Sequence, residues 1–183
     1  MASGMSRPGT TGATEGAVRA GLYTPEERVR RDSTVWTTVQ GVLAPLQFLV
    51  FAVSLVLVIR YLMTGEGYWL ATVSIVLKTL LLYTIMVTGA IWEKVVFGKY
   101  LFAPAFFWED VFSMAVIALH TLYLWALFAG WATDTQMWIA LAAYFAYVIN
   151  AAQFVWKLRM ARLQEAATRA AAADSRKSEG VAA

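Results

Sequence analysis

The dominant pattern in this chain is four long runs of apolar residues that carry very few charges. The runs cover about residues 42–62, 69–91, 107–129 and 137–156. Each is about 20 residues long, the length that an α-helix needs to cross a hydrocarbon layer of ~30 Å. The pattern therefore predicts an all-α integral membrane protein, a four-helix bundle, with a single membrane domain over residues 22–163.

A short helix is predicted just before the first run. Thr24, Pro25 and Glu27 form a capping-box pattern with proline at the first helical position, which is typical of a helix start. Arginines and apolar residues alternate after it, so we expect this helix to lie at the membrane interface. Gly41 and Pro45 predict a bend where it meets the first span.

The two ends of the chain predict no packed structure. Residues 1–21 are rich in Gly, Ser, Thr and Ala and lack an apolar core, so we expect a disordered tail rather than a signal peptide. Residues 164–183 are expected to form a flexible C-terminal tail. Its Ala-rich beginning can extend the fourth helix by a few turns, and residues 175–183 are expected to be loose.

Composition supports a membrane protein and excludes several kinds of site. Apolar residues make up 60% of the 183 residues and charged residues 15%, which is too apolar for an ordinary soluble domain. The absence of cysteine excludes disulfides, thiolate metal sites and iron–sulfur clusters. The single histidine, His120, excludes a bis-histidine haem. The sequence contains no phosphate-binding glycine loop and no dinucleotide fingerprint.

The distribution of basic residues predicts the orientation in the membrane. Lys and Arg precede the first span, follow the fourth, and occur in the link 92–106, whereas the links 63–68 and 130–136 contain none. The positive-inside rule therefore places both termini and the 92–106 link in the cytoplasm. Basic segments that flank spans are expected to contact anionic membrane lipid rather than nucleic acid.

Ionisable residues at the mouth of the third span are the main candidates for function, because charges at membrane depth are costly. Glu109 and Asp110 begin this span, and Glu93 lies within reach across the link. Glu109, Ser113 and His120 fall on one stripe of the helix, whereas Asp110 points about 100° away. The alternative is a pair of first-turn carboxylates that only interact with the helix dipole. We favour a functional site.

Further polar residues lie deeper in the apolar runs. Three roles are open for His120: a hydrogen bond to a neighbouring helix, ligation of the metal of a bound pigment, or proton transfer. Lys78 must pair, snorkel or lose its proton, and pairing with an acid is as plausible as a structural role. Asn150 and Gln153 share a face with Tyr147, which favours helix association over catalysis.

Five blocks of the sequence are similar to one known family. They are LYTPE (22–26), VQGVLAPLQF (39–48), YTIMVTGAIWEKVVFGK (83–99), LFAPAFFWED (101–110) and YVINAAQF (147–154). Together they resemble the 3-vinyl bacteriochlorophyllide hydratase family of phototrophic bacteria. The resemblance covers about residues 22–163. It implies addition of water to the 3-vinyl group of a chlorophyllide-type ring, which gives a 3-(1-hydroxyethyl) group in bacteriochlorophyll a synthesis.

The resemblance also implies a location and partners. The location is a bacterial inner membrane, either the cytoplasmic or the intracytoplasmic photosynthetic membrane. The partners are the tetrapyrrole substrate and membrane lipid, with other pigment-synthesis enzymes as candidates. Hydration needs an acid and a base but no redox cofactor, and the magnesium ion is part of the substrate, so we expect no cofactor and no protein metal site. The acid and base would be Glu109 and Asp110, with Glu93 as substitute for either. His120 would ligate the substrate magnesium or relay a proton.

The remaining predicted site residues would bind the ring. Aromatic residues at the start of the third span would stack on it: Phe106, Phe107 and Trp108. Lys94 or Lys99 would pair with the free propionate of the substrate. Polar residues of the second and fourth spans complete the predicted set: Lys78, Asn150 and Gln153.

Two other functions stay open at this point. A pigment-binding or assembly subunit would use His120 as a chlorophyll ligand and carry out no chemistry. A small transporter would use Lys78 and the carboxylates as a proton path, although the sequence has no inverted repeat or paired broken helices.

Overall fold

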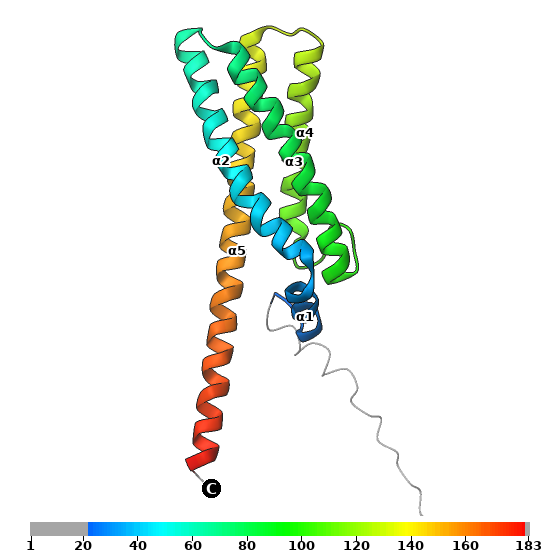
Figure 1. Cartoon of the computed structure of the whole chain (residues 1–183), viewed down its shortest axis with the longest axis vertical. Coiled ribbons are helices and arrows are strands. Elements are labelled where there is room, and N and C mark those ends of the chain that lie inside the picture. The colour runs from blue at the N-terminus through cyan, green and yellow to red at the C-terminus, as the bar shows by residue number, and fades with distance from the viewer. Residues whose placement is uncertain (1–21, 182–183) are drawn as a thin grey trace, which may run out of the picture.

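The computed structural model describes residues 22–181, and every regular element in this range is an α-helix. The predicted disordered tail, residues 1–21, lies outside the described residues. The elements are α1 (Pro25–Ser33), α2 (Val35–Thr64), α3 (Tyr68–Phe97), α4 (Phe107–Phe128) and α5 (Thr133–Val181) (Figure 1). The prediction of an all-α protein is confirmed.

Four of these helices are long and apolar enough to cross a membrane: α2, α3, α4 and the Thr133–Ala170 part of α5. The four predicted spans are therefore confirmed as helices, although the helices are longer than the apolar runs. The 30 residues of α2 or of α3 correspond to about 45 Å at ~1.5 Å per residue. Each of them therefore extends beyond a hydrocarbon layer of ~30 Å.

The junction between the first two helices differs from the prediction. As predicted, α1 starts with a capping box, in which Oγ1 of Thr24 accepts from the Glu27 amide and the Glu27 carboxylate accepts from the Thr24 amide. However, α1 already ends at Ser33, and extended Thr34 separates it from α2. The predicted junction at residues 41–45 is wrong, because Pro45 lies inside α2. A proline removes one backbone donor, and a long packed helix tolerates that loss.

The four long helices form a closed bundle. Contacts join α2 to α3, α3 to α4, α4 to α5, and α5 back to α2. Figure 1 shows α1, the α3–α4 link and the C-terminal part of α5 at one end of the bundle, which we call the termini end. The α2–α3 and α4–α5 links lie at the opposite end. Both described ends of the chain therefore lie on the same side, as an even number of spans requires.

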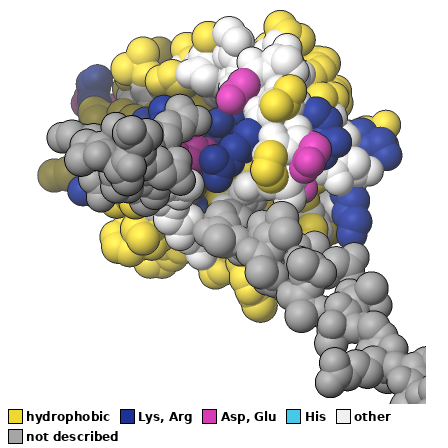
Figure 2. Space-filling view, turned by 90° about the horizontal axis from the view of Figure 1, so that it is seen from below, with side chains coloured by type: hydrophobic (Ala, Val, Ile, Leu, Met, Phe, Trp, Pro, Cys, Tyr) yellow, Lys and Arg dark blue, Asp and Glu magenta, His cyan; other side chains and the backbone are white. Residues whose placement is uncertain are grey.

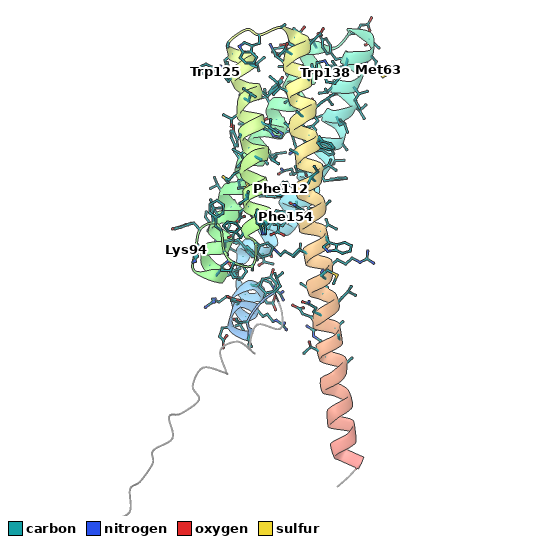
Figure 3. The ribbon with its side chains drawn as sticks, turned by 180° about the vertical axis from the view of Figure 1, so that it is seen from behind. Met63, Lys94, Phe112, Trp125, Trp138 and Phe154 are labelled. Atoms are coloured by element: carbon teal, nitrogen blue, oxygen red, sulfur yellow. The ribbon has the colours of Figure 1, made fainter. Side chains whose placement is uncertain are left out.

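The packed core and the outer surface fit a lipid environment. The core lies mainly toward the opposite end and includes Val58, Ile75 and Tyr123, which are all fully buried. The outward surface is also apolar, with side chains such as Trp125 and Trp138 largely exposed. Figure 3 shows these two tryptophans near the opposite end, where an interfacial aromatic belt is expected.

The last helix continues much further than the apolar run from which it was predicted. The sequence predicts a flexible tail over residues 164–183, whereas the backbone of α5 is helical to Val181. Figure 1 shows this part of α5 projecting past the bundle. The segment is rich in alanine, which has the highest helix propensity, so local preference favours continuation of the helix.

Candidate active site

A pocket of about 780 Å³ lies in the half of the bundle near the termini end. Its walls come from the first half of α2, the second half of α3 and the middle of α5, with additions from α1 and the start of α4. Most of the lining is apolar, including Phe48, Leu82 and Met86. The volume and this lining are typical of a site for one small-molecule ligand.

A few polar groups interrupt the apolar wall. The carboxylates that line it are Glu93, Asp110 and Glu165, and the cations are Arg31 and Arg162. Neutral polar side chains also contribute: Gln40, Gln47, Ser113 and Asn150. Figure 2 shows the termini end, where Lys and Arg side chains gather next to acidic ones among apolar residues. One end of the pocket is therefore charged, and the rest is suited to an apolar molecule.

Glu93 and Asp110 form a buried carboxyl pair. Glu93 is 6% exposed and Asp110 is 3% exposed. Their carboxyl groups are in direct contact. Oδ2 of Asp110 accepts a hydrogen bond from the Phe102 amide at 2.7 Å. Oε2 of Glu93 accepts one from the Ala103 amide at 3.3 Å. Two successive backbone donors of the α3–α4 link therefore hold the pair from one side.

The backbone of this link is in an unusual conformation. Phe102 has a φ of 58°, in the left-handed region that bulky residues rarely adopt. Such a conformation costs of order 1–3 kcal/mol and persists only where the surroundings impose it. At this position it presents the amides of Phe102 and Ala103 to the carboxyl pair. The strain is thus located directly at the candidate site.

Glu109 does not join the pair, although the sequence predicts it as acid or base. Its carboxylate accepts from Nζ of Lys157 on α5 at 2.6 Å, and it does not line the pocket. Neighbouring residues of a helix point about 100° apart. Because Asp110 faces Glu93 on α3, Glu109 faces α5. In the sequence, Lys157 belongs to the basic residues that follow the fourth span, and no local signal links it to Glu109, which lies 48 positions away.

The structure also separates the three aromatic residues predicted to stack on a ring. Phe106 is 3% exposed and lines the pocket. Its ring packs against Phe154 and Trp92, with centroids 5.9 and 5.8 Å away. Phe107 and Trp108, by contrast, are exposed and do not line the pocket. Trp92 and Phe154 also line the pocket, which the sequence does not predict, because aromatic residues at the ends of spans are typical of an interfacial belt.

The deep ionisable residues lie outside the pocket. Lys78 is fully buried, with Nζ 3.8 Å from the ring centroid of Tyr147. Tyr147 lines the pocket, whereas Lys78 does not. His120 is also fully buried, and its Nδ1 donates to the Val116 carbonyl at 2.8 Å. Neither Lys78 nor His120 is placed to touch a ligand in the pocket.

The other predicted binding residues divide in the same way. Asn150 lines the pocket and donates to Oγ of Ser113 at 2.9 Å, whereas Gln153 does not line it. Nζ of Lys94 donates to the Gly98 carbonyl at 2.9 Å, outside the pocket, and Figure 3 shows Lys94 at the outer edge of the bundle. Lys99 does not line the pocket either.

Tyr23 and Arg31 close the charged end of the pocket. Burial raises the pKa of Tyr23 to about 12, so its hydroxyl stays neutral. The Arg31 guanidinium lies 4.7 Å from the centroid of the Tyr23 ring. Arg31 also pairs with Asp32 at 2.8 Å and with Glu165 of α5 at 3.2 Å. These contacts tie the N-terminal helix to α5 across the pocket.

Comparison with known proteins identifies one family. The 2-vinyl bacteriochlorophyllide hydratase family matches residues 23–160. A 2-vinyl bacteriochlorophyllide hydratase of Rhodobacter capsulatus is 76% identical over 148 residues, which cover 81% of this chain and 86% of the relative. One of Cereibacter sphaeroides is 77% identical over 142 residues, or 78% of this chain and 89% of the relative. No solved structure matches significantly. The matched region includes the carboxyl pair.

Proposed function

We propose that this chain, which belongs to the 2-vinyl bacteriochlorophyllide hydratase family, hydrates the vinyl group of a bacteriochlorophyllide-type ring bound in the pocket. The family resemblance of the sequence blocks is thereby confirmed. Family membership assigns the chain to the hydro-lyases of bacteriochlorophyll synthesis. The observation that carries the site is the buried pair of Glu93 and Asp110 in the wall of an otherwise apolar pocket. The vinyl group is numbered 2 or 3 according to the ring convention used.

The carboxyl pair can supply both proton transfers of a hydration. A hydrogen bond between two carboxyl groups requires a proton on one of them, so the pair contains one acid and one base. The acid donates its proton to the terminal vinyl carbon, and the positive charge that forms on the inner carbon is spread over the conjugated ring. A water molecule attacks that carbon, and the carboxylate base takes the proton that the water loses.

Contact between the two groups also explains how the site can return to its starting state. After one turnover the acid has become a carboxylate and the base has become an acid. Because Glu93 and Asp110 touch, transfer of one proton between them restores the original distribution. The amides of Phe102 and Ala103 hold one oxygen of each group in place during this exchange. The net reaction consumes one water and leaves the protein unchanged.

The apolar lining provides the binding surface for the ring. Phe106, Trp92 and Phe154 present aromatic faces or edges to the pocket, where a flat conjugated ring can pack. An apolar wall also keeps bulk water away from the cation formed on the inner carbon. The proposed steps use only two carboxyl groups and water. We therefore propose no cofactor of the protein's own and treat the magnesium ion as part of the substrate.

The proposed membrane placement is a bacterial inner membrane with both termini in the cytoplasm. The basic residues of α1, of the α3–α4 link and of α5 gather at the termini end, which supports this orientation. In this placement α1 lies at the interface and the carboxyl pair lies near the cytoplasmic boundary. An amphiphilic ring can then enter from the boundary between lipid and water.

The test is product formation by the chain expressed in a host that makes no bacteriochlorophyll. Membranes are incubated with vinyl chlorophyllide in water labelled with ¹⁸O, and pigments are separated by chromatography and mass spectrometry. We expect a hydroxyethyl product that contains one labelled oxygen. Recovery of unchanged vinyl pigment bound in stoichiometric amount would instead support a pigment-binding scaffold and overturn the proposal.

A further inference from the structure

We infer that Arg31 and Arg162 form a binding site for the free carboxylate of the substrate at the charged end of the pocket. This inference rests on the proposed function and names the part of the substrate that the pocket recognises besides its ring. A bacteriochlorophyllide is a ring with a free propionate, so it is an amphiphilic acid. Binding such an acid in an apolar pocket requires a cation where the carboxylate comes to rest.

The choice of these two residues follows from which cations line the pocket. Arg31 of α1 and Arg162 of α5 do so, whereas Lys94, Lys99 and Lys157 do not. Lys94 bonds the Gly98 carbonyl and Lys157 pairs with Glu109. The lysines proposed from the sequence for this role are therefore placed elsewhere, and two arginines from helices far apart in the chain take their position.

Arg31 is held in a fixed position before any ligand binds. Its Nε lies 2.8 Å from Asp32, its Nη1 lies 3.2 Å from Glu165, and its guanidinium lies against the Tyr23 ring. A guanidinium has five N–H donors, so these contacts leave donors for a further carboxylate. Its charge, however, is already balanced by two acidic neighbours.

Arg162 supplies the charge that is not balanced. It lies three residues before Glu165 on α5, on the same side of the helix, and its side chain is exposed. Among the side chains that the structure describes, residues 22–170, no ion-pair partner of Arg162 is found. An incoming carboxylate therefore meets a cation that pairs with none of the described acidic side chains, beside a guanidinium that is already oriented. Planar guanidinium groups bind carboxylates with two parallel hydrogen bonds.

The experiment compares the free acid with its methyl ester, because the ester keeps the ring and the vinyl group but loses the charge. Hydration rates are measured over a range of concentrations for the wild type, Arg162→Gln, Arg162→Lys and Arg31→Gln. A charge-assisted hydrogen bond contributes enough that its loss raises KM roughly 10- to 100-fold. We expect that increase for Arg162→Gln with the acid, at nearly unchanged kcat, and no increase with the ester. Arg162→Lys should restore part of the difference.

The matched control is Arg159→Gln, which removes a cation of the same helix that does not line the pocket. It should leave both KM values unchanged. Equal effects of Arg162→Gln on acid and ester, or no effect on either, would overturn the inference. Should the wild type hydrate neither compound, the proposed function fails, and quenching of tryptophan fluorescence still tests the inference. In that assay the acid must bind the wild type more tightly than it binds Arg162→Gln, and the ester must bind both equally.

Discussion

The substitution Asp110→Asn tests which of the two neighbouring carboxylates of α4 takes part in the reaction. The substitution removes a group that can give or take a proton, but the amide oxygen of asparagine can still accept from the Phe102 amide. A positioned acid or base contributes about 10²- to 10⁴-fold to a rate. Turnover should fall by that factor, which corresponds to about 2.7–5.4 kcal/mol of transition-state stabilisation. Initial rates with vinyl chlorophyllide, followed by chromatography of the hydroxyethyl product, measure it.

The matched control is Glu109→Gln, one residue away on the same helix. Glu109 pairs with Lys157 and does not line the pocket, so this variant should keep turnover within about 3-fold of the wild type. Glu93→Gln should resemble Asp110→Asn, and the double variant should be little worse than either single one, because the pair acts as a unit. If Glu109→Gln lowers turnover as much as Asp110→Asn does, the assignment of the reaction to Asp110 rather than Glu109 is refuted. Near-normal turnover in all three would refute carboxyl catalysis.

Three further predictions test the surroundings of the site. Lys157→Met leaves the buried Glu109 without its cation and should lower the free energy of unfolding by about 1–3 kcal/mol, measured by thermal unfolding. The loss is smaller than for a fully buried pair, because the Lys157 side chain is 27% exposed. Adding Glu109→Gln should recover most of the lost stability. Ala103→Pro removes the amide that bonds Glu93, so turnover should fall at least about 10-fold, whereas Ala103→Gly keeps that donor and should retain activity. Phe106→Ala should lower unfolding stability by about 3–5 kcal/mol and raise KM, while exposed Trp108→Ala should change neither.

The spans could be predicted from the sequence because hydrophobicity and length decide them almost alone. The region of the site could also be predicted, since few ionisable residues interrupt the apolar runs and two of them, Glu109 and Asp110, lie next to each other at the α3–α4 link. The sequence does not predict which of the two carboxylates, Glu109 or Asp110, faces the pocket. Helical geometry places Glu109 and Asp110 about 100° apart, but it does not say which of them faces α3. That depends on helix packing, and the partner of Glu109 lies 48 residues away in the chain.

The same limit explains the binding residues. Lys94 and Lys99 are near the site in sequence, but the termini end is built from three distant segments. Arg31 and Arg162 are 131 positions apart and meet the pocket only because α1 folds against the bundle next to α5. The sequence shows that these charged residues are present, but it does not show that the fold brings them together. Likewise, the sequence does not distinguish an aromatic residue that is exposed at the end of a span, such as Trp108, from one that lines the pocket, such as Trp92.

The α3–α4 link connects backbone strain with the proposed chemistry. Two carboxyl groups brought together in an apolar wall repel one another unless one is protonated, and each still requires hydrogen-bond donors. The backbone donors that reach the pair come from the link between α3 and α4. Phe102, whose amide bonds Asp110, has a left-handed conformation that costs of order 1–3 kcal/mol, and the next amide bonds Glu93. The strained residue thus lies against the carboxyl pair, and such strain often occurs at functional sites.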